Sequence, residues 1–88
     1  MNVVFKKSFL KDLKKVKDDK LKNAIYECIS NIESAEKVED IKNLKKLTGY
    51  QNYYRIRLGQ YRMGIKMEDN TLYIVCFDHR KDIYTSFP

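Results

Sequence analysis

Arginine is rare in this chain, and the positions of the arginines are the first indication of a functional site. Four of the 88 residues are arginine and fourteen are lysine, and every basic residue before position 55 is a lysine. An arginine guanidinium binds phosphate oxygens through two parallel hydrogen bonds, whereas a lysine ammonium acts as a well-hydrated point charge. The pattern therefore indicates a binding site for a phosphate-bearing ligand, formed by Arg55, Arg57, Arg62 and Arg80.

The net charge of +6 is unevenly distributed along the sequence. No acidic residue lies between Asp40 and Glu68. A block of one sign attracts a polyanion, and nucleic acid is the commonest one. The alternative is a basic surface that only keeps the protein soluble, which explains the charge but not its position. The basic residues of this stretch are Lys42, Lys45, Lys46, Arg55, Arg57, Arg62 and Lys66.

A β-hairpin is predicted around the first three arginines. Residues 53–58 and 61–67 alternate in polarity, and the loop between them, Gly59-Gln60, begins with glycine as a type II′ turn requires. The side chains of one face would then form part of the core. They are Tyr54, Ile56, Leu58, Tyr61, Met63 and Ile65.

Counting outward from the hairpin loop places Arg57 opposite Arg62 and Arg55 opposite Gly64. Like charges directly opposed across two strands destabilise a sheet by up to about 1 kcal/mol. Because no acidic residue lies near these arginines in the sequence, a bound anion would offset this cost. The same face would also carry Tyr53 and Lys66.

The segment after the last predicted strand brings further polar groups toward the same site. Arg80 can reach the same anion, and Tyr84 can stack on a base or orient a hydroxyl. A histidine side chain can transfer a proton near neutral pH, so His79 is a candidate for proton transfer, although a single histidine is more often structural than catalytic. Asp82 is expected to pair with a neighbouring basic residue rather than to do chemistry.

The elements that must position these residues predict an α+β fold. Val3, Val4 and Phe5 read as a first strand, Ser8 as the N-cap of a first helix, and Asp18 or Asp19 as the cap of a second. Residues 35–47 fit a short helix or a 3₁₀ connection. Residues 72–77 form an apolar run, as expected of a central strand covered on both faces. We expect a single domain, 1–88, with a small antiparallel-rich sheet, formed by the N-terminal strand and a C-terminal three-stranded meander, and two N-terminal α-helices packed on one face.

The remaining aromatic and sulfur side chains are assigned to packing or to ligand contact. Cys28 and Cys76 lie among apolar neighbours, which favours buried free thiols. Tyr53 and Tyr84 are candidates for RNA contact. The tyrosines predicted to be core or half-buried are Tyr26, Tyr54, Tyr61 and Tyr73.

Composition argues against several classes of protein. No apolar run approaches the roughly 20 residues that a membrane span needs, and the basic N-terminus does not fit a secretory signal, so we expect a cytoplasmic protein. One histidine and two separated cysteines nearly exclude a zinc site. We therefore expect no metal and no cofactor.

Three segments of the C-terminal half resemble the RelE/ParE superfamily of bacterial type II toxins. They are Lys46-Leu47-Thr48-Gly49, Tyr54-Arg55-Ile56-Arg57-Leu58-Gly59-Gln60-Tyr61-Arg62 and His79-Arg80-Lys81-Asp82-Ile83-Tyr84. The resemblance is specific from about Lys45 to Tyr84, while the N-terminal half matches only in its length and its paired helices. The family fold is the one predicted above.

The resemblance implies an endoribonuclease that cleaves messenger RNA in the ribosomal A site without metal. The 2′-hydroxyl attacks the adjacent phosphorus and leaves a cyclic phosphate. Arg55, Arg57 and Arg62 would stabilise the charge growing on the phosphorus, Arg80 would hold the phosphate or protonate the leaving oxygen, and Tyr84 would stack on the base or help to activate the hydroxyl. Proton transfer, where a partner is needed, would fall to His79 or Lys66. Further RNA contacts are expected from Lys45, Lys46, Tyr53 and Lys81.

The resemblance also implies partners. They are the ribosome, its message and a small antitoxin, mostly acidic, that wraps the toxin, with operator DNA bound only through the toxin–antitoxin complex. Two alternatives stay open from the sequence. One is a ParE-like toxin that inhibits DNA gyrase without nuclease activity, and the other is a nucleic-acid-binding module without catalysis.

Overall fold

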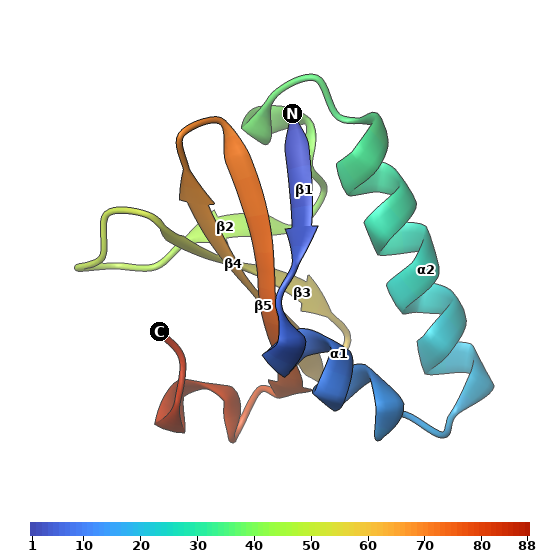
Figure 1. Ribbon diagram of the computed structural model, residues 1–88. Coiled ribbons are helices and arrows are strands. Elements are labelled where there is room, and N and C mark those ends of the chain that lie inside the picture. Colours follow the sequence, from blue (N-terminus) through green and yellow to red (C-terminus); the bar gives the residue numbers. More distant parts are fainter.

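The computed structural model describes residues 1–88 and confirms the predicted α+β class. A five-stranded sheet has the strand order β1-β5-β4-β3-β2, in which only β1 and β5 are parallel neighbours. The helices are α1 (Lys7–Lys14) and α2 (Asp19–Ser34), with short 3₁₀ helices η1 (Val38–Asp40) and η2 (Ile83–Thr85). The strands are β1 (Asn2–Phe5), β2 (Leu44–Lys46), β3 (Tyr53–Leu58), β4 (Tyr61–Glu68) and β5 (Thr71–His79) (Figure 1).

The main core lies between the two helices and one face of the sheet. Phe9 of α1 and Ile25 and Ile32 of α2 are fully buried and belong to one cluster with the inward-facing residues of three strands. Burying a side chain of this size contributes about 1.5–3 kcal/mol. Hydrophobic packing therefore fixes which face of the sheet the helices cover. The buried strand residues are Ile56, Met63, Ile65, Leu72, Ile74 and Phe77.

The β3–β4 hairpin has the register that the sequence predicts. Arg57 pairs with Arg62 and Arg55 pairs with Gly64 across the two strands. Gly59 opens the turn with a φ of +60°, a left-handed conformation that glycine adopts without strain. The side chains of Arg55, Arg57 and Arg62 therefore leave the sheet on the face opposite the helices.

The structure corrects the prediction for residues 35–47. The expected 3₁₀ turn is present as η1, but Leu44–Lys46 forms an edge strand that the sequence did not predict. A strand of three residues is too short to show a period of two, and its apolar residue also fits the preceding three-residue period. The consequence for the site is direct, because Lys45 pairs with Arg55 across β2 and β3.

The strand at the centre of the sheet is β4, not the apolar strand β5. Leu72, Ile74 and Phe77 of β5 are buried beneath the helices, whereas the residues that alternate with them are only half-buried. β5 is therefore an interior strand, between β1 and β4, that is fully buried on the helix side and half-buried on the other side. Its second face is covered in part by the C-terminal tail rather than by a helix.

Two local predictions for the helices have different outcomes. Helix α1 begins at Lys7 and has no side-chain cap, because the Ser8 hydroxyl donates to the carbonyl oxygen of Val75 in β5 instead. Asp18 does cap α2, since its carboxylate accepts a hydrogen bond of 2.9 Å from the backbone N–H of Lys20.

Tyr26 on α2 is 55% exposed, so its assignment to packing is wrong.

A small second cluster covers the arginine-bearing face of the sheet at its centre. The C-terminal tail crosses the sheet on the side away from α2 (Figure 1) and buries Ile83 and Phe87. The Phe87 ring packs edge-on against Tyr53 at 5.7 Å between centroids. A Cβ atom on Gly64 would lie 2.6 Å from Cys76 Sγ and 2.9 Å from the Phe87 ring. Glycine at position 64 is therefore what allows the tail to sit on the sheet.

Both cysteines are free and half-buried, and burial raises the pKa of each thiol to about 11. A thiol with a raised pKa is a poor nucleophile at neutral pH because little thiolate is present. Cys28 and Cys76 are therefore packing residues, and the expectation of free thiols is confirmed.

We expect Gly64→Ala to lower the free energy of unfolding by about 1–3 kcal/mol, because the added methyl group overlaps Cys76 and Phe87. Urea unfolding measures this directly. The cost should be smaller when Phe87→Ala is already present, since the ring that the methyl group meets is then absent. Equal costs of Gly64→Ala in both backgrounds would show that the tail does not press on this position.

Candidate anion-binding groove

An open groove of about 450 Å³ lies on the arginine-bearing side of the molecule. It is formed by β2 and the loop after it, by β3 and β4, and by the C-terminal tail. Six of its nine lining residues are cationic and none is acidic. A groove of this composition attracts anions by its field and offers both bidentate and point-charge donors. The lining residues are Lys45, Lys46, Leu47, Thr48, Arg55, Arg62, Arg80, Lys81 and Tyr84.

The three arginines of the groove are held by neutral acceptors. Arg55 Nη1 donates to the carbonyl oxygen of Asn43 at 3.1 Å. Arg62 Nη1 donates to the carbonyl oxygens of Gly59 and Tyr61, each at 2.9 Å. Arg80 Nε donates to Gln60 Oε1 at 2.7 Å. These bonds orient the guanidinium groups without neutralising their charge.

The four arginines form no ion pair with the protein's carboxylates, since the one ion pair within 4 Å joins Lys66 to Glu68 at 3.1 Å. The crowding of positive charge is evident at Arg62. Its pKa is lowered by partial desolvation and by the charges of Arg55, Arg57 and Arg80, while Tyr84 acts in the opposite direction. An anion in the groove would relieve this repulsion.

One carboxylate lies on the same face of the sheet, contrary to the expectation from the sequence. Asp78 of β5 pairs with Arg62 in the β4–β5 register, so both side chains leave the sheet on the same side. Asp78 Oδ1 accepts a hydrogen bond of 2.8 Å from the backbone N–H of His79 and forms no ion pair with Arg62. Asp78 therefore leaves the arginines of the groove without an ion-pair partner.

The structure separates Arg57 from Arg55. Arg57 does not line the groove but faces a neighbouring depression of about 460 Å³. Arg62 and Arg80 line both cavities. The predicted cluster of four arginines is thus real, but it surrounds two adjacent cavities rather than one.

The tail places Tyr84 at the edge of the groove. Tyr84 lies on η2 between two buried anchors, Ile83 and Phe87, and remains 51% exposed. A ring exposed in this way and fixed at both sides is free to stack on a nucleobase. Lys45, Lys46 and Lys81 also line the groove, in agreement with their expected proximity to the site.

Besides Arg57, three of the candidate residues lie outside the groove. The Tyr53 ring packs between Tyr50 and Phe87, beneath the ammonium of Lys66. Lys66 pairs with Glu68, and this pairing raises the pKa of Lys66. His79 pairs with Tyr61 across β4 and β5, and its Nδ1 accepts a hydrogen bond of 3.1 Å from the backbone N–H of Lys81.

Sequence reasoning missed the residues that orient the arginines. Asn43 has a left-handed φ of +63°, and its carbonyl oxygen accepts from both Arg55 Nη1 and the backbone N–H of Arg57. Gln60 holds Arg80 through its side chain and its backbone carbonyl oxygen. An asparagine before a short strand is a weak signal of such a turn, and nothing in the sequence indicates that Gln60 meets Arg80.

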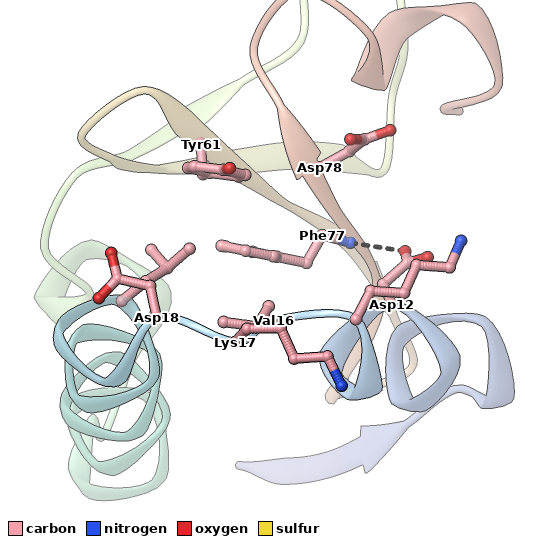
Figure 2. A pocket seen from close by; sticks show the side chains of 9 residues that line it. Asp12, Val16, Lys17, Asp18, Tyr61, Phe77 and Asp78 are labelled. Atoms are coloured by element: carbon pink, nitrogen blue, oxygen red, sulfur yellow. Dashed lines mark hydrogen bonds between the residues drawn. The ribbon is translucent and has the colours of Figure 1, made fainter.

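A further cavity, of about 230 Å³, lies on the opposite side of the sheet from the groove. It is on the helix-covered side, between the α1–α2 connection and the end of the sheet. Figure 2 shows the rings of Tyr61 and Phe77 stacked nearly parallel and Asp12 hydrogen-bonded to the backbone N–H of Phe77. Aspartates and lysines both line it, so it lacks the single sign of charge that distinguishes the arginine groove.

Neither helix has the length and apolar character that a bilayer crossing requires.

Comparison with known proteins identifies the family. A family model described as the ParE toxin of the type II toxin-antitoxin system parDE matches residues 3–84. Toxin RelE3 of Methanocaldococcus jannaschii is 42% identical over 89 residues and is matched over the full length of both chains.

Solved structures show the same fold. A chain of the RelB-RelE antitoxin-toxin complex from Methanococcus jannaschii matches with a TM-score of 0.79 and 40% identity. The match covers 97% of this chain and 99% of that chain. The RelBE2 complex from Mycobacterium tuberculosis matches with a TM-score of 0.68 and 26% identity over 90% and 96% of the two chains. The RelE-RelB complex from Pyrococcus horikoshii OT3, at 22% identity and a TM-score of 0.71 over 92% and 96%, supports the fold alone. The chain therefore belongs to the RelE/ParE superfamily of type II toxins, and it is a toxin of the RelE type.

Proposed function

We propose that this toxin is an endoribonuclease that cleaves messenger RNA in the ribosomal A site. The observation that carries the proposal is the groove in which Arg55, Arg62 and Arg80 meet Tyr84 without a carboxylate in its lining. A phosphodiester fits such a set of fixed guanidinium groups. Its negative charge is shared by two non-bridging oxygens, and a guanidinium can bind both through two parallel hydrogen bonds.

The proposed reaction uses the RNA's own nucleophile. The 2′-hydroxyl oxygen attacks the adjacent phosphorus and loses its proton, while the bond from phosphorus to the 5′ oxygen breaks and that oxygen gains a proton. The products are a cyclic phosphate and a 5′-hydroxyl. Negative charge grows on the non-bridging oxygens in the transition state, and donors already in place stabilise it by about 3–4 kcal/mol each.

The roles follow from the positions of the side chains. Arg55 and Arg62 lie on neighbouring strands and are fixed by backbone carbonyl groups, so we assign them to the non-bridging oxygens. Arg80 comes from the tail and would hold the phosphate from another side or donate to the leaving oxygen. Lys45, Lys46 and Lys81 supply point charges along the groove, suited to neighbouring parts of the RNA backbone.

The chain offers few groups that could transfer a proton at the reacting phosphate. His79 and Lys66 both lie outside the groove lining, and Lys66 is already paired with Glu68. Within the groove, the hydroxyl groups of Thr48 and Tyr84 can both donate and accept a hydrogen bond, and a phenol is the more acidic of the two kinds of hydroxyl. We therefore propose that catalysis rests mainly on charge stabilisation and on the alignment of the 2′-hydroxyl, with solvent or Tyr84 as the proton carrier.

The proposed partner is an acidic antitoxin that covers this groove. Solved complexes pair RelE with RelB in Methanococcus jannaschii, and RelBE2 of Mycobacterium tuberculosis is also a toxin-antitoxin complex. Carboxylates of a partner would compete with RNA for the same guanidinium groups, which explains neutralisation by simple occupancy. Binding to operator DNA is proposed for the toxin–antitoxin complex and not for the toxin alone.

Inhibition of DNA gyrase is the second candidate, since the matching family model is described by ParE. A gyrase inhibitor acts through protein contacts and does not need a complete set of phosphate-binding arginines. The full set present here favours the nuclease. Mapping message ends on translating ribosomes, together with a supercoiling assay, separates the two functions: cuts in the A site support the nuclease, and inhibited supercoiling with intact message would overturn it.

We expect Arg62→Ala to lower the single-turnover rate of message cleavage on ribosomes by about 100- to 1,000-fold, because one preorganised donor to the phosphate is lost. Arg62→Lys should recover only part of the rate, since an ammonium cannot form the planar pair of bonds. Lys20→Ala, which removes an exposed charge on α2, is the matched control and should cleave like the unmodified toxin. Comparable rates for the control and both Arg62 variants would rule out a role for this guanidinium.

Substitution at Tyr84 separates stacking from hydroxyl chemistry. Tyr84→Ala should reduce cleavage by about 5- to 160-fold, the effect of losing a base stack of about 1–3 kcal/mol. If the ring acts only by stacking, Tyr84→Phe keeps the unmodified rate, and if the hydroxyl carries a proton, Tyr84→Phe is as slow as Tyr84→Ala. An unaltered rate in both variants would remove Tyr84 from the proposed site.

We expect His79→Gln to change the cleavage rate by less than about threefold between about pH 6 and 8, the range in which a histidine titrates. The reason is geometric: the ring lies against Tyr61 outside the groove, and its Nδ1 is occupied by the N–H of Lys81. The rate is measured as a pH profile beside that of the unmodified toxin. Loss of a titration step in the variant would reinstate His79 as the proton-transfer group.

A further inference from the structure

The depression beside the groove has no role in the reaction as proposed. It lies at the end of the β3–β4 hairpin and is lined only by polar side chains and glycine. Its volume, about 460 Å³, is close to that of the groove, about 450 Å³. The lining residues are Asn43, Arg57, Gly59, Gln60, Arg62 and Arg80. Three of the six carry a positive charge and none carries a negative one.

Arg57 differs from the other three arginines in having no partner. Arg55, Arg62 and Arg80 each donate to a carbonyl or amide oxygen of the protein, whereas the Arg57 guanidinium makes neither a hydrogen bond nor an ion pair. It is exposed at the mouth of the depression and pairs across the hairpin with Arg62. An exposed guanidinium opposite another costs stability unless an anion binds between or beside them.

The wall between the two cavities is itself cationic. Arg62 and Arg80 line both cavities, and Gln60 fixes Arg80 there through its side-chain oxygen at 2.7 Å and its backbone carbonyl oxygen at 2.8 Å. Two anions placed in the two cavities would therefore both contact this wall. A ligand with regularly spaced phosphates on one flexible chain meets this arrangement better than two separate ions.

We infer that the depression is a second phosphate subsite, in which Arg57 binds the RNA phosphate next to the one that is cleaved. This rests on the proposed function. Arg57 then acts on RNA affinity and register, while Arg55 and Arg62 act on the reacting phosphate. Phosphate contacts of this kind position a nucleic acid without reading its sequence.

The test compares two ligands that differ by one phosphate. The probes are a dinucleoside monophosphate and a trinucleoside diphosphate, both 2′-deoxy at the attacking position so that binding is measured without cleavage. With the unmodified toxin we expect the longer probe to bind about tenfold more tightly, with a salt dependence steeper by about 0.7 in log–log slope. With Arg57→Ala the gain should fall to about twofold, the statistical value for two equivalent phosphates.

Lys20→Ala is the charge-matched control and should retain the full gain. An unchanged gain in Arg57→Ala would overturn the subsite, as would the absence of a gain in the unmodified toxin. Two further outcomes would also contradict the subsite. If Arg57→Ala lost affinity equally for both probes, Arg57 would lie at the reacting phosphate instead. If Arg57→Ala weakened binding to an acidic antitoxin and left both probes unaffected, Arg57 would belong to the surface that binds the protein partner. Because the probes are not cleaved, a full gain combined with no message cleavage on ribosomes would sustain the subsite and refute the nuclease proposal alone.

Discussion

Mutual repulsion among guanidinium groups is the constraint on which the arrangement of this domain depends. The β3–β4 register sets Arg57 against Arg62, and the pKa of Arg62 is lowered by partial desolvation and then by the charges of Arg55, Arg57 and Arg80. No carboxylate forms an ion pair with any of them, although twelve acidic residues are present in the chain. Other parts of the structure must therefore hold these side chains in place against their own repulsion.

The scaffold meets this requirement with two hydrophobic layers of unequal size. The large core under α1 and α2 fixes the register of β3, β4 and β5, and so fixes which residues face away from it. The small cluster of Ile83 and Phe87 on the opposite face fixes the tail, so that Arg80 and Tyr84 reach the groove from outside the sheet. Gly64 joins the two layers, because its missing side chain is the space that Phe87 occupies beside Cys76.

Sequence patterns predicted the parts of the site that depend on strand alternation. The turn at Gly59, the pairing of Arg57 with Arg62 and the helix-covered face all followed from a period of two and a glycine at the loop. The strand β2 was missed because three residues carry no usable period, and with it the pairing of Lys45 with Arg55 was missed as well.

Contacts that depend on tertiary structure were beyond the sequence for a different reason. The bond between Gln60 and Arg80 joins residues 20 positions apart, and Asp78 reaches the arginine face only through the β4–β5 register. The exclusion of His79 from the groove depends on the same register, which pairs it with Tyr61. The division of the arginines into two cavities likewise depends on side-chain directions that spacing along the chain does not determine.

The same constraint links ligand binding to the stability of the fold. A polyanion that neutralises the groove binds the folded chain more tightly than the unfolded one, because unfolding disperses the four arginines along the sequence. Such a ligand stabilises the fold by mass action as well as by occupying the site. On the proposed function, an acidic antitoxin and an RNA backbone would satisfy this one electrostatic requirement in two ways, and they would compete because the guanidinium groups of the domain converge on one surface. In that proposal, inhibition by an antitoxin would need no change in the toxin's shape, because carboxylates that occupied Arg55, Arg62 and Arg80 would already exclude a phosphodiester.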